Sequence, residues 1–345
     1  MTSERLWPLI ATGLAIVMGG ALVAGFGHDP IAAYGSLLAG AFGSGYAVAT
    51  TLARALPLML AGLAVALSFQ SGLFNIGASG QFWLGAIAAA WVGFRVQAPT
   101  WVHLPGALVA GTVAGAAWAA IVPGLAKAYR GANEVITTLM MTYAAVYFGH
   151  YLIEGGPMQA PGFVPQSPEI AASATLPTLV LGSQLSWGLV LAPLAAVAVW
   201  FLMQRTALGF ALRVTGLNPR AARYAGINPA WAVLTALALS GAIAGFAGAV
   251  QVLGVDHRLY DSFGTEAGFT GIVVALLARN NPFGVLVAAV LFGALASGGN
   301  TMQLNAGVPF HLVDVIQGLI IFFIAAEGLL RYVRPTRPAL SRRPT

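Results

Sequence analysis

Side chains that could carry out chemistry are few in this sequence, and they lack the spacings that catalysis or metal binding requires. Of 345 residues, 10 are Asp or Glu, 5 are His and none is Cys. The absence of cysteine excludes disulfides, thiolate metal sites and iron–sulfur clusters. No two histidines stand at i and i+4, so we expect no metal site and no cofactor. The histidines are His28, His103, His150, His257 and His311.

The charged residues also exclude a built-in source of energy. The only lysine, Lys127, is followed by alanine, so the chain contains no Gly-x-x-x-x-Gly-Lys-Ser/Thr loop for binding a nucleotide. An ion-coupled carrier would more often bury carboxylates in its apolar segments, and Asp314 is the only plausible one. Asp314 is expected near the outer interface, and Arg54 can snorkel to that surface. Any energy for transport is therefore expected from a separate subunit.

The remaining residues are typical of an all-α polytopic membrane protein. The chain is 58% hydrophobic and 8% charged, with a mean hydropathy of +0.82, and apolar runs of about 20 residues recur from end to end. The eighth run, 267–278, covers only about 18 Å of a core roughly 30 Å thick, so it is half-length, broken or re-entrant. About ten runs can be distinguished: 6–26, 52–70, 78–97, 104–126, 134–153, 186–204, 229–252, 267–278, 283–299 and 309–330.

The basic residues predict the orientation of these segments. With the N-terminus inside, most of the lysines and arginines fall in inside loops, as the positive-inside rule requires. Both termini are therefore expected in the cytoplasm, and the net charge of +6 indicates orientation and not nucleic-acid binding. We expect a transmembrane domain over 1–331. The basic tail, 332–345, is expected to be disordered and able to touch anionic lipid.

One inside loop, 205–228, carries a local helix signal. Asn218 is a good N-cap, Pro219 fits the first helical position and Gly226 is a natural stop. We therefore expect a short helix from Pro219 to Ala225. The loop contains no acid and four arginines, Arg205, Arg213, Arg220 and Arg223. This combination indicates a docking element on the cytoplasmic side.

A second stretch, Ser71 to Gln81, interrupts two apolar helices with glycines and amides. Polar groups inside a bilayer are tolerated where they line a cavity or pack against protein. Asn75 and Gln81 could therefore face a transport pathway. The alternative is an ordinary cytoplasmic turn between two spans, and the residues alone do not decide between the two.

The fifth apolar segment begins with a comparable ambiguity. Asn133 is suited to cap the helix, and the acidic Glu134 complements the positive end of its dipole. Capping alone explains both residues. A pathway role for Asn133, Thr137 or Thr138 is the sharper alternative.

Four blocks of sequence carry a resemblance to a known family. The chain resembles the permease subunits of bacterial ABC importers in the nucleoside, simple-sugar and branched-chain amino acid superfamily, most closely the nucleoside-type branch. One departure is Ser79, where relatives commonly place Glu. The blocks are 72–81, 133–140, 216–227, and 268–277 with 281–284.

The resemblance implies a small-molecule importer in the bacterial inner membrane that works by alternating access. Its partners would be a second permease, a cytoplasmic ATP-binding subunit and an extracytoplasmic substrate-binding protein, and the chain itself would be no enzyme. A ribose-like sugar permease is the alternative within this class; an ion-coupled secondary carrier and a channel are the alternatives outside it.

Two sets of site residues follow from this reading. The 217–226 segment is predicted to couple the permease to its ATPase, with Arg220 and Arg223 in polar contacts and Leu217 and Tyr224 packed in the ATPase groove. The full coupling set is Leu217, Asn218, Pro219, Arg220, Arg223, Tyr224 and Gly226. The predicted translocation path contains Asn75, Ser79, Gln81, Asn133 and Thr137.

Overall fold

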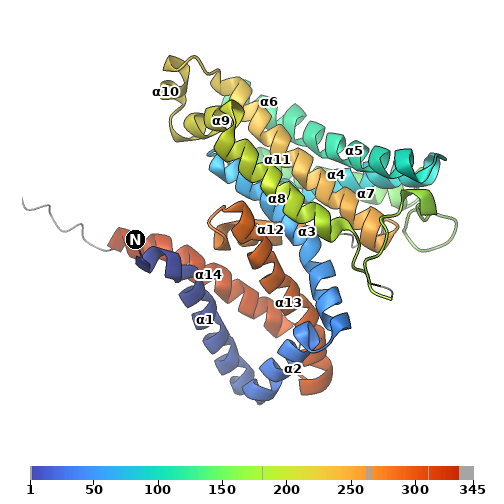
Figure 1. Cartoon of the computed structure of the whole chain (residues 1–345), viewed down its shortest axis with the longest axis vertical. Helices are drawn as coiled ribbons and strands as arrows, with labels where there is room; N and C mark the ends of the chain where they lie inside the picture. The colour runs from blue at the N-terminus through green and yellow to red at the C-terminus, as the bar shows by residue number, and fades with distance from the viewer. Residues whose placement is uncertain (1, 181, 262, 264–265, 310, 334–345) are drawn as a thin grey trace, which may run out of the picture.

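The computed structural model describes residues 2–333 except 181, 262, 264–265 and 310, and within these it is all-α, as expected (Figure 1). The predicted tail, 332–345, lies almost wholly outside the described residues. The helices are α1 Thr2–Gly25, α2 Pro30–Phe42, α3 Gly45–Gln70, α4 Ala78–Arg95, α5 Thr100–Ala119, α6 Leu125–Arg130, α7 Glu134–Ile153, α8 Gly188–Arg205, α9 Ala207–Leu217, α10 Pro219–Tyr224, α11 Pro229–Gln251, α12 Ala267–Leu277, α13 Pro282–Ala306 and α14 His311–Val333.

Each apolar segment expected from the sequence coincides with one or more of these helices. Two π-helical turns extend the longest ones, η1 (Ala120–Gly124) between α5 and α6 and η3 (Val252–Asp256) after α11. Among the described residues, five stretches are long and apolar enough to cross a membrane: α3, α5 through α6, α8, α11 with η3, and α13. The short segment is confirmed as α12, whose 11 residues rise only about 17 Å.

Two helices were not expected. α2 has 13 residues, too few to cross a membrane. Its N-cap is Asp29, whose carboxylate accepts a 2.8 Å hydrogen bond from the Ile31 amide, and Pro30 occupies the first helical position. α9 lies in the loop that the arginines had marked as cytoplasmic. It begins at the Thr206 cap, whose hydroxyl accepts from the Gly209 amide at 3.1 Å.

The helices pack in two groups around α3. α11 contacts α3, α4 and α5, whereas α13 packs against α2 and α3, and α1 lies along α14. Glycines allow the α5–α11 contact to be unusually close. A Cβ atom on Gly115 would stand 2.3 Å from the Gly241 carbonyl oxygen, so any larger residue would push the two helices apart.

The helix directions place α10 and the C-terminal end of α14 on the same side of the molecule, hereafter the α10 side. Gly72, after α3, touches the backbone of Gly216 beside α10. The Gln70 amide donates a 2.6 Å hydrogen bond to the Asn280 carbonyl, which precedes α13. Because α13 runs away from this side and α14 returns, α14 ends there, next to the N-terminal end of α1 (Figure 1).

Candidate functional site

The helix α10 forms because its first and last turns are capped by its own sequence. The Asn218 carboxamide oxygen accepts from the backbone amides of Arg220 at 3.0 Å and Ala221 at 3.1 Å. At the other end Gly226 adopts φ +78°, and the Ile227 amide donates to the Ala222 carbonyl at 2.9 Å. The helix is one residue shorter than predicted because Ala225 is already its C-cap.

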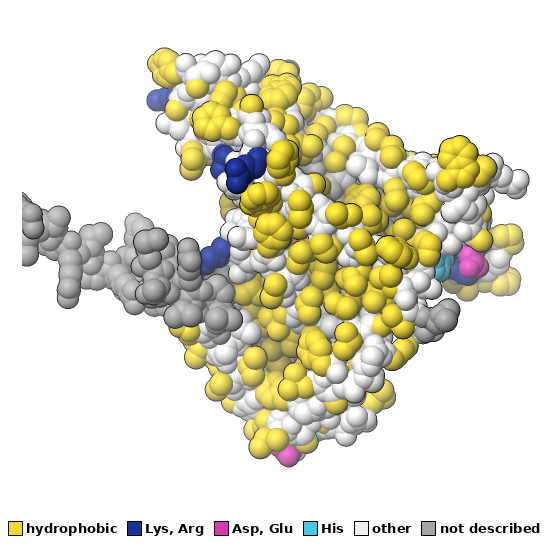
Figure 2. Space-filling model, viewed as in Figure 1, with side chains coloured by type: hydrophobic (Ala, Val, Ile, Leu, Met, Phe, Trp, Pro, Cys, Tyr) yellow, Lys and Arg dark blue, Asp and Glu magenta, His cyan; other side chains and the backbone are white. Residues whose placement is uncertain are grey.

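The side chains of α10 point away from the rest of the chain. Leu217 is 87% exposed and Tyr224 is 94% exposed, and both Arg220 and Arg223 are exposed as well. Only Ala222 is buried within this short helix. Two large apolar side chains held in solvent beside two cations are typical of a surface that a partner protein covers. Figure 2 shows basic side chains gathered at this end and acidic ones at the opposite end.

The α10 element is joined to the membrane-embedded core through glycine contacts. A Cβ atom on Gly216 would meet the Ser71 carbonyl oxygen at 2.4 Å, and one on Gly72 would meet the Gly216 Cα at 2.5 Å. The end of α9 therefore lies directly on the start of the break between α3 and α4. A cavity of about 340 Å³ beside this contact is lined by residues that include Glu134, Pro219 and Arg223. Sequence reasoning missed this backbone contact.

The break itself folds back into the protein and is closed by hydrogen bonds. Asn75 is fully buried and Gln81 is 1% exposed, and their carboxamides pair reciprocally at 2.8 and 3.0 Å. The Asn75 amide also donates to the Ser240 hydroxyl at 2.9 Å, which donates to the Ala64 carbonyl at 2.7 Å. These bonds connect α3, α4 and α11 in the interior, whereas Gly72 and Phe74 of the break are exposed.

Ser79 lies at the point where α4 and α12 both begin. It is fully buried, and its hydroxyl has no hydrogen-bond partner among the described residues. A Cβ atom on Gly268 would stand 2.2 Å from the Ser79 amide nitrogen. The two helix starts are therefore in direct backbone contact, which leaves little room for a larger side chain at position 79.

The remaining predicted path residues lie apart from this network. Asn133 caps α7 by accepting from the Val135 amide at 2.9 Å, and the Thr137 hydroxyl donates to the Asn133 carbonyl at 3.2 Å. Thr138, which is buried, accepts from the Ile76 amide at 3.2 Å and so joins α7 to the break. The pathway role of Asn75, Ser79, Gln81, Asn133 and Thr137 stays a prediction.

Two larger cavities lie at opposite ends of the same three helices, α3, α12 and α13. The α10-side cavity, about 670 Å³, is lined by residues that include Gln70, Arg205 and Asn280. The far chamber, about 570 Å³, is lined by residues that include Arg54 and Asp314. Sequence reasoning had placed Arg54 and Asp314 at the outer surface, without a chamber between them.

A packed apolar layer separates the two cavities. Val274 of α12 and Val285 of α13 are both fully buried. A Cβ atom on Gly62 would meet the side chain of Val285 at 2.8 Å and that of Val274 at 3.0 Å. Because Gly62 has no side chain, α3, α12 and α13 pack directly against one another at this level.

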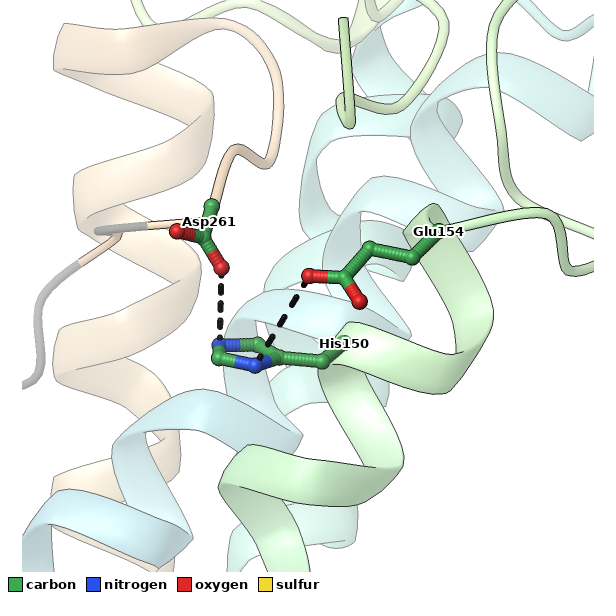
Figure 3. A group of neighbouring side chains, drawn as sticks. All are labelled: His150, Glu154 and Asp261. Carbon is green, nitrogen blue, oxygen red and sulfur yellow. Dashed lines mark ion pairs between the residues drawn. The ribbon is translucent and has the colours of Figure 1, made fainter.

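A third group of side chains, His150, Glu154 and Asp261, comes from the end of α7 and the segment after η3 (Figure 3). The His150 Nδ1 lies 3.9 Å from a Glu154 oxygen, and its Nε2 lies 3.2 Å from an Asp261 oxygen. An imidazole offers one nitrogen to a metal ion, whereas the carboxylates here face different ring nitrogens. The arrangement suits a histidine that lies between two carboxylates better than a metal centre. Sequence reasoning missed it because Asp261 is distant along the chain.

Comparison with known proteins agrees with the helical architecture. Residues 47–325 match the family described as branched-chain amino acid transport system / permease component. The chain is 38% identical to the guanosine ABC transporter permease protein NupP of Bacillus subtilis (strain 168), over 96% of each protein. It is 34% identical to the nucleoside ABC transporter permease protein NupB of Lactococcus lactis subsp. cremoris (strain MG1363), over 98% of this chain and 95% of that one.

A relative with a different named substrate is equally similar. The glucose ABC transporter permease protein TsgB13 of Haloferax volcanii is 38% identical over 94% of this chain and 88% of its own length. No solved structure matches the chain. These relatives are transport components and not enzymes, and the apolar helices make the chain a multi-pass membrane protein. The chain belongs to the family of branched-chain amino acid transport system permease components.

Proposed function

We propose that this chain is the permease subunit of an ATP-driven importer for nucleosides, working by alternating access in the bacterial inner membrane. Support comes from the two nucleoside-type relatives, each similar over nearly its whole length. A simple sugar is the second candidate, because the glucose permease of Haloferax volcanii is 38% identical. In either case both termini lie in the cytoplasm, on the α10 side.

The single observation that carries the proposal is the exposure of α10. Leu217 at the end of α9 and Tyr224 of the capped helix α10 project into solvent beside arginines. An apolar side chain in solvent gains free energy when a partner removes it from water, by about 25 cal/mol per Å² of buried apolar surface. We place the ATP-binding subunit on this surface, with the arginines at the polar rim of the contact.

Movement of α10 has a direct route into the membrane-embedded core. The backbone contact between Gly216 and Gly72 leads from α9 to the break, and the Asn75–Gln81–Ser240 bonds lead from the break to α3 and α11. Because these groups are closely packed, a displacement of α10 shifts the neighbouring helices as well. A second permease of the same family and a substrate-binding protein on the side opposite α10 complete the importer.

The two cavities on α3, α12 and α13 suit alternating access. A solute would enter the far chamber and leave through the α10-side cavity. The layer of Gly62, Val274 and Val285 closes the way between them. The conformational change that ATP would drive is the opening of this layer toward one cavity at a time.

The proposal is tested by reversing charge on α10. We expect the Arg220→Glu, Arg223→Glu double variant to insert and fold normally, because both side chains are exposed, but to lose ATP-dependent uptake and copurification of the ATP-binding subunit. Arg95→Glu is the matched control, since Arg95 is exposed at the end of α4 and has no role in the proposed contact. Normal ATP-coupled uptake by the double variant would contradict the proposal.

A further inference from the structure

The far chamber combines features that the proposed coupling role of α10 does not explain. Its walls come from α3, α11 with η3, α12, α13 and α14, and from the loops at the end opposite α10. Its volume of about 570 Å³ lies within the range of roughly 300–1,000 Å³ that is typical of small-molecule sites.

One wall of the chamber presents a cation deep within a span. Arg54 follows the start of α3 at Gly45 by nine residues, which places its Cα about 14 Å along the helix. A guanidinium at that depth is costly next to lipid. Here it lies against water-accessible space, and among the described residues it makes one long hydrogen bond, 3.4 Å to the Ala296 carbonyl. Its other donors are therefore available to a solute.

Another part of the lining contains a carboxylate and the two side chains that donate to it. The Gln251 amide donates to Asp256 at 2.7 Å, and the Tyr260 hydroxyl donates to the same carboxylate at 3.0 Å. Burial and the neighbouring carboxylate raise the pKa of Tyr260 to about 12, so its hydroxyl remains a donor at neutral pH.

The charges of the lining select the kind of solute. Asp256, Glu266 and Asp314 contribute carboxylates, whereas Arg54 is the guanidinium among the lining residues. An anion such as a phosphate ester would be repelled by this excess of negative charge. The lining contains both donors and acceptors, which suits groups that both donate and accept, and hydroxyls are such groups.

Resting on the proposed import function, we propose that the far chamber is the permease's own solute-binding site and that it takes an uncharged solute rich in hydroxyls. The pentose of a nucleoside and a free sugar both meet this description, whereas a phosphorylated sugar or nucleotide does not. The chamber would then add a second selection, by charge, to that of the substrate-binding protein.

The absence of cysteine from the chain allows a direct test. Ala296→Cys places a thiol in the wall of the chamber, and Leu304→Cys places one at the same end of α13 on an 85% exposed site outside it. Each variant is assembled with the second permease and the ATP-binding subunit in lipid nanodiscs, without the substrate-binding protein, and labelled with a membrane-impermeant maleimide. The probes are guanosine, glucose and guanosine 5′-monophosphate.

We expect guanosine or glucose to slow the labelling of Ala296→Cys several-fold, the monophosphate to leave it unchanged, and no probe to affect Leu304→Cys. Adding Asp314→Asn should raise the concentration needed for protection roughly tenfold, because a hydrogen bond to a charged group is lost. Equal protection by the monophosphate would overturn the solute class.

The same complexes separate this inference from the proposed function. If the full importer carries guanosine or glucose with ATP, yet neither solute protects Ala296→Cys, the far chamber is not the solute site and the import function stands. If the full importer shows no ATP-dependent uptake of either solute, the proposed function itself is contradicted, and the inference with it.

Discussion

The exposed helix α10 and the buried break between α3 and α4 are the two polar interruptions of an otherwise apolar chain, and they are built in opposite ways. In α10 the backbone is capped while the side chain of Tyr224, like that of Leu217 at the end of α9, remains in solvent. In the break the side chains of Asn75 and Gln81 are sealed by bonds to each other and to Ser240.

The difference indicates which side chains stabilise the fold and which are available for function. Side chains with partners inside the chain stabilise its fold, so changing them should alter stability and transport together. Side chains without such partners are available to another subunit, so changing them should alter transport alone. Three substitutions test this division, in order of decreasing effect on stability.

The largest effect is expected from Gly268→Ala. The new methyl group would stand 2.2 Å from the Ser79 amide nitrogen and 2.3 Å from its hydroxyl oxygen, so the starts of α4 and α12 must separate. We expect a loss of about 3 kcal/mol or more, measured as a lower thermal midpoint in detergent, together with loss of uptake. Gly106→Ala on α5, where nothing lies within 4 Å, is the control. Equal midpoints for the two variants would show that the contact is not tight.

An intermediate effect is expected from Asn75→Leu. This change leaves the Gln81 carboxamide and the Gly77 amide without their partner, and the Ser240 hydroxyl loses the bond that it accepts. Because buried unsatisfied groups cost about 1–3 kcal/mol each, we expect a loss of roughly 3 kcal/mol and a marked fall in the thermal midpoint. Asn133→Ala, which removes an exposed cap, should cost only about 1 kcal/mol. A larger loss for Asn133→Ala than for Asn75→Leu would reverse the comparison.

The smallest effect on stability is expected from Asn218→Ala. Two amides at the start of α10 lose their acceptor, which should weaken the helix locally by about 1 kcal/mol. Since α10 projects from the bundle, the thermal midpoint should stay unchanged while uptake falls. Asn218→Ser should restore uptake, because serine is also a good N-cap. Full uptake by Asn218→Ala would mean that the shape of α10 is unimportant for coupling.

Local signals made α10 predictable. Asn218, Pro219 and Gly226 act within a few residues of one another, so the helix and its exposure follow from sequence. The ten apolar segments are predictable for the same reason. α2 escaped prediction because its 13 residues fall short of a span, and α9 because its arginine suggested a loop.

The long-range contacts could not be predicted from the sequence. The Asn75 carboxamide meets Ser240 across 165 positions of the chain, and the far chamber draws residues from five separate helices. Nothing in the local pattern of Arg54 or Asp314 indicates that the two line one chamber. Such sites arise from how the helices pack, and packing depends on many small contacts at once.

The most direct test of the central claim, that α10 contacts the ATP-binding subunit, is cross-linking from a single introduced thiol. Tyr224→Cys stands on α10 at a 94% exposed site, and Leu304→Cys stands near the end of α13 on the opposite side at an 85% exposed site. With a short thiol–amine cross-linker in the assembled importer, we predict a covalent product with the ATP-binding subunit from Tyr224→Cys and none from Leu304→Cys. No product from Tyr224→Cys, or equal products from both positions, would contradict the account.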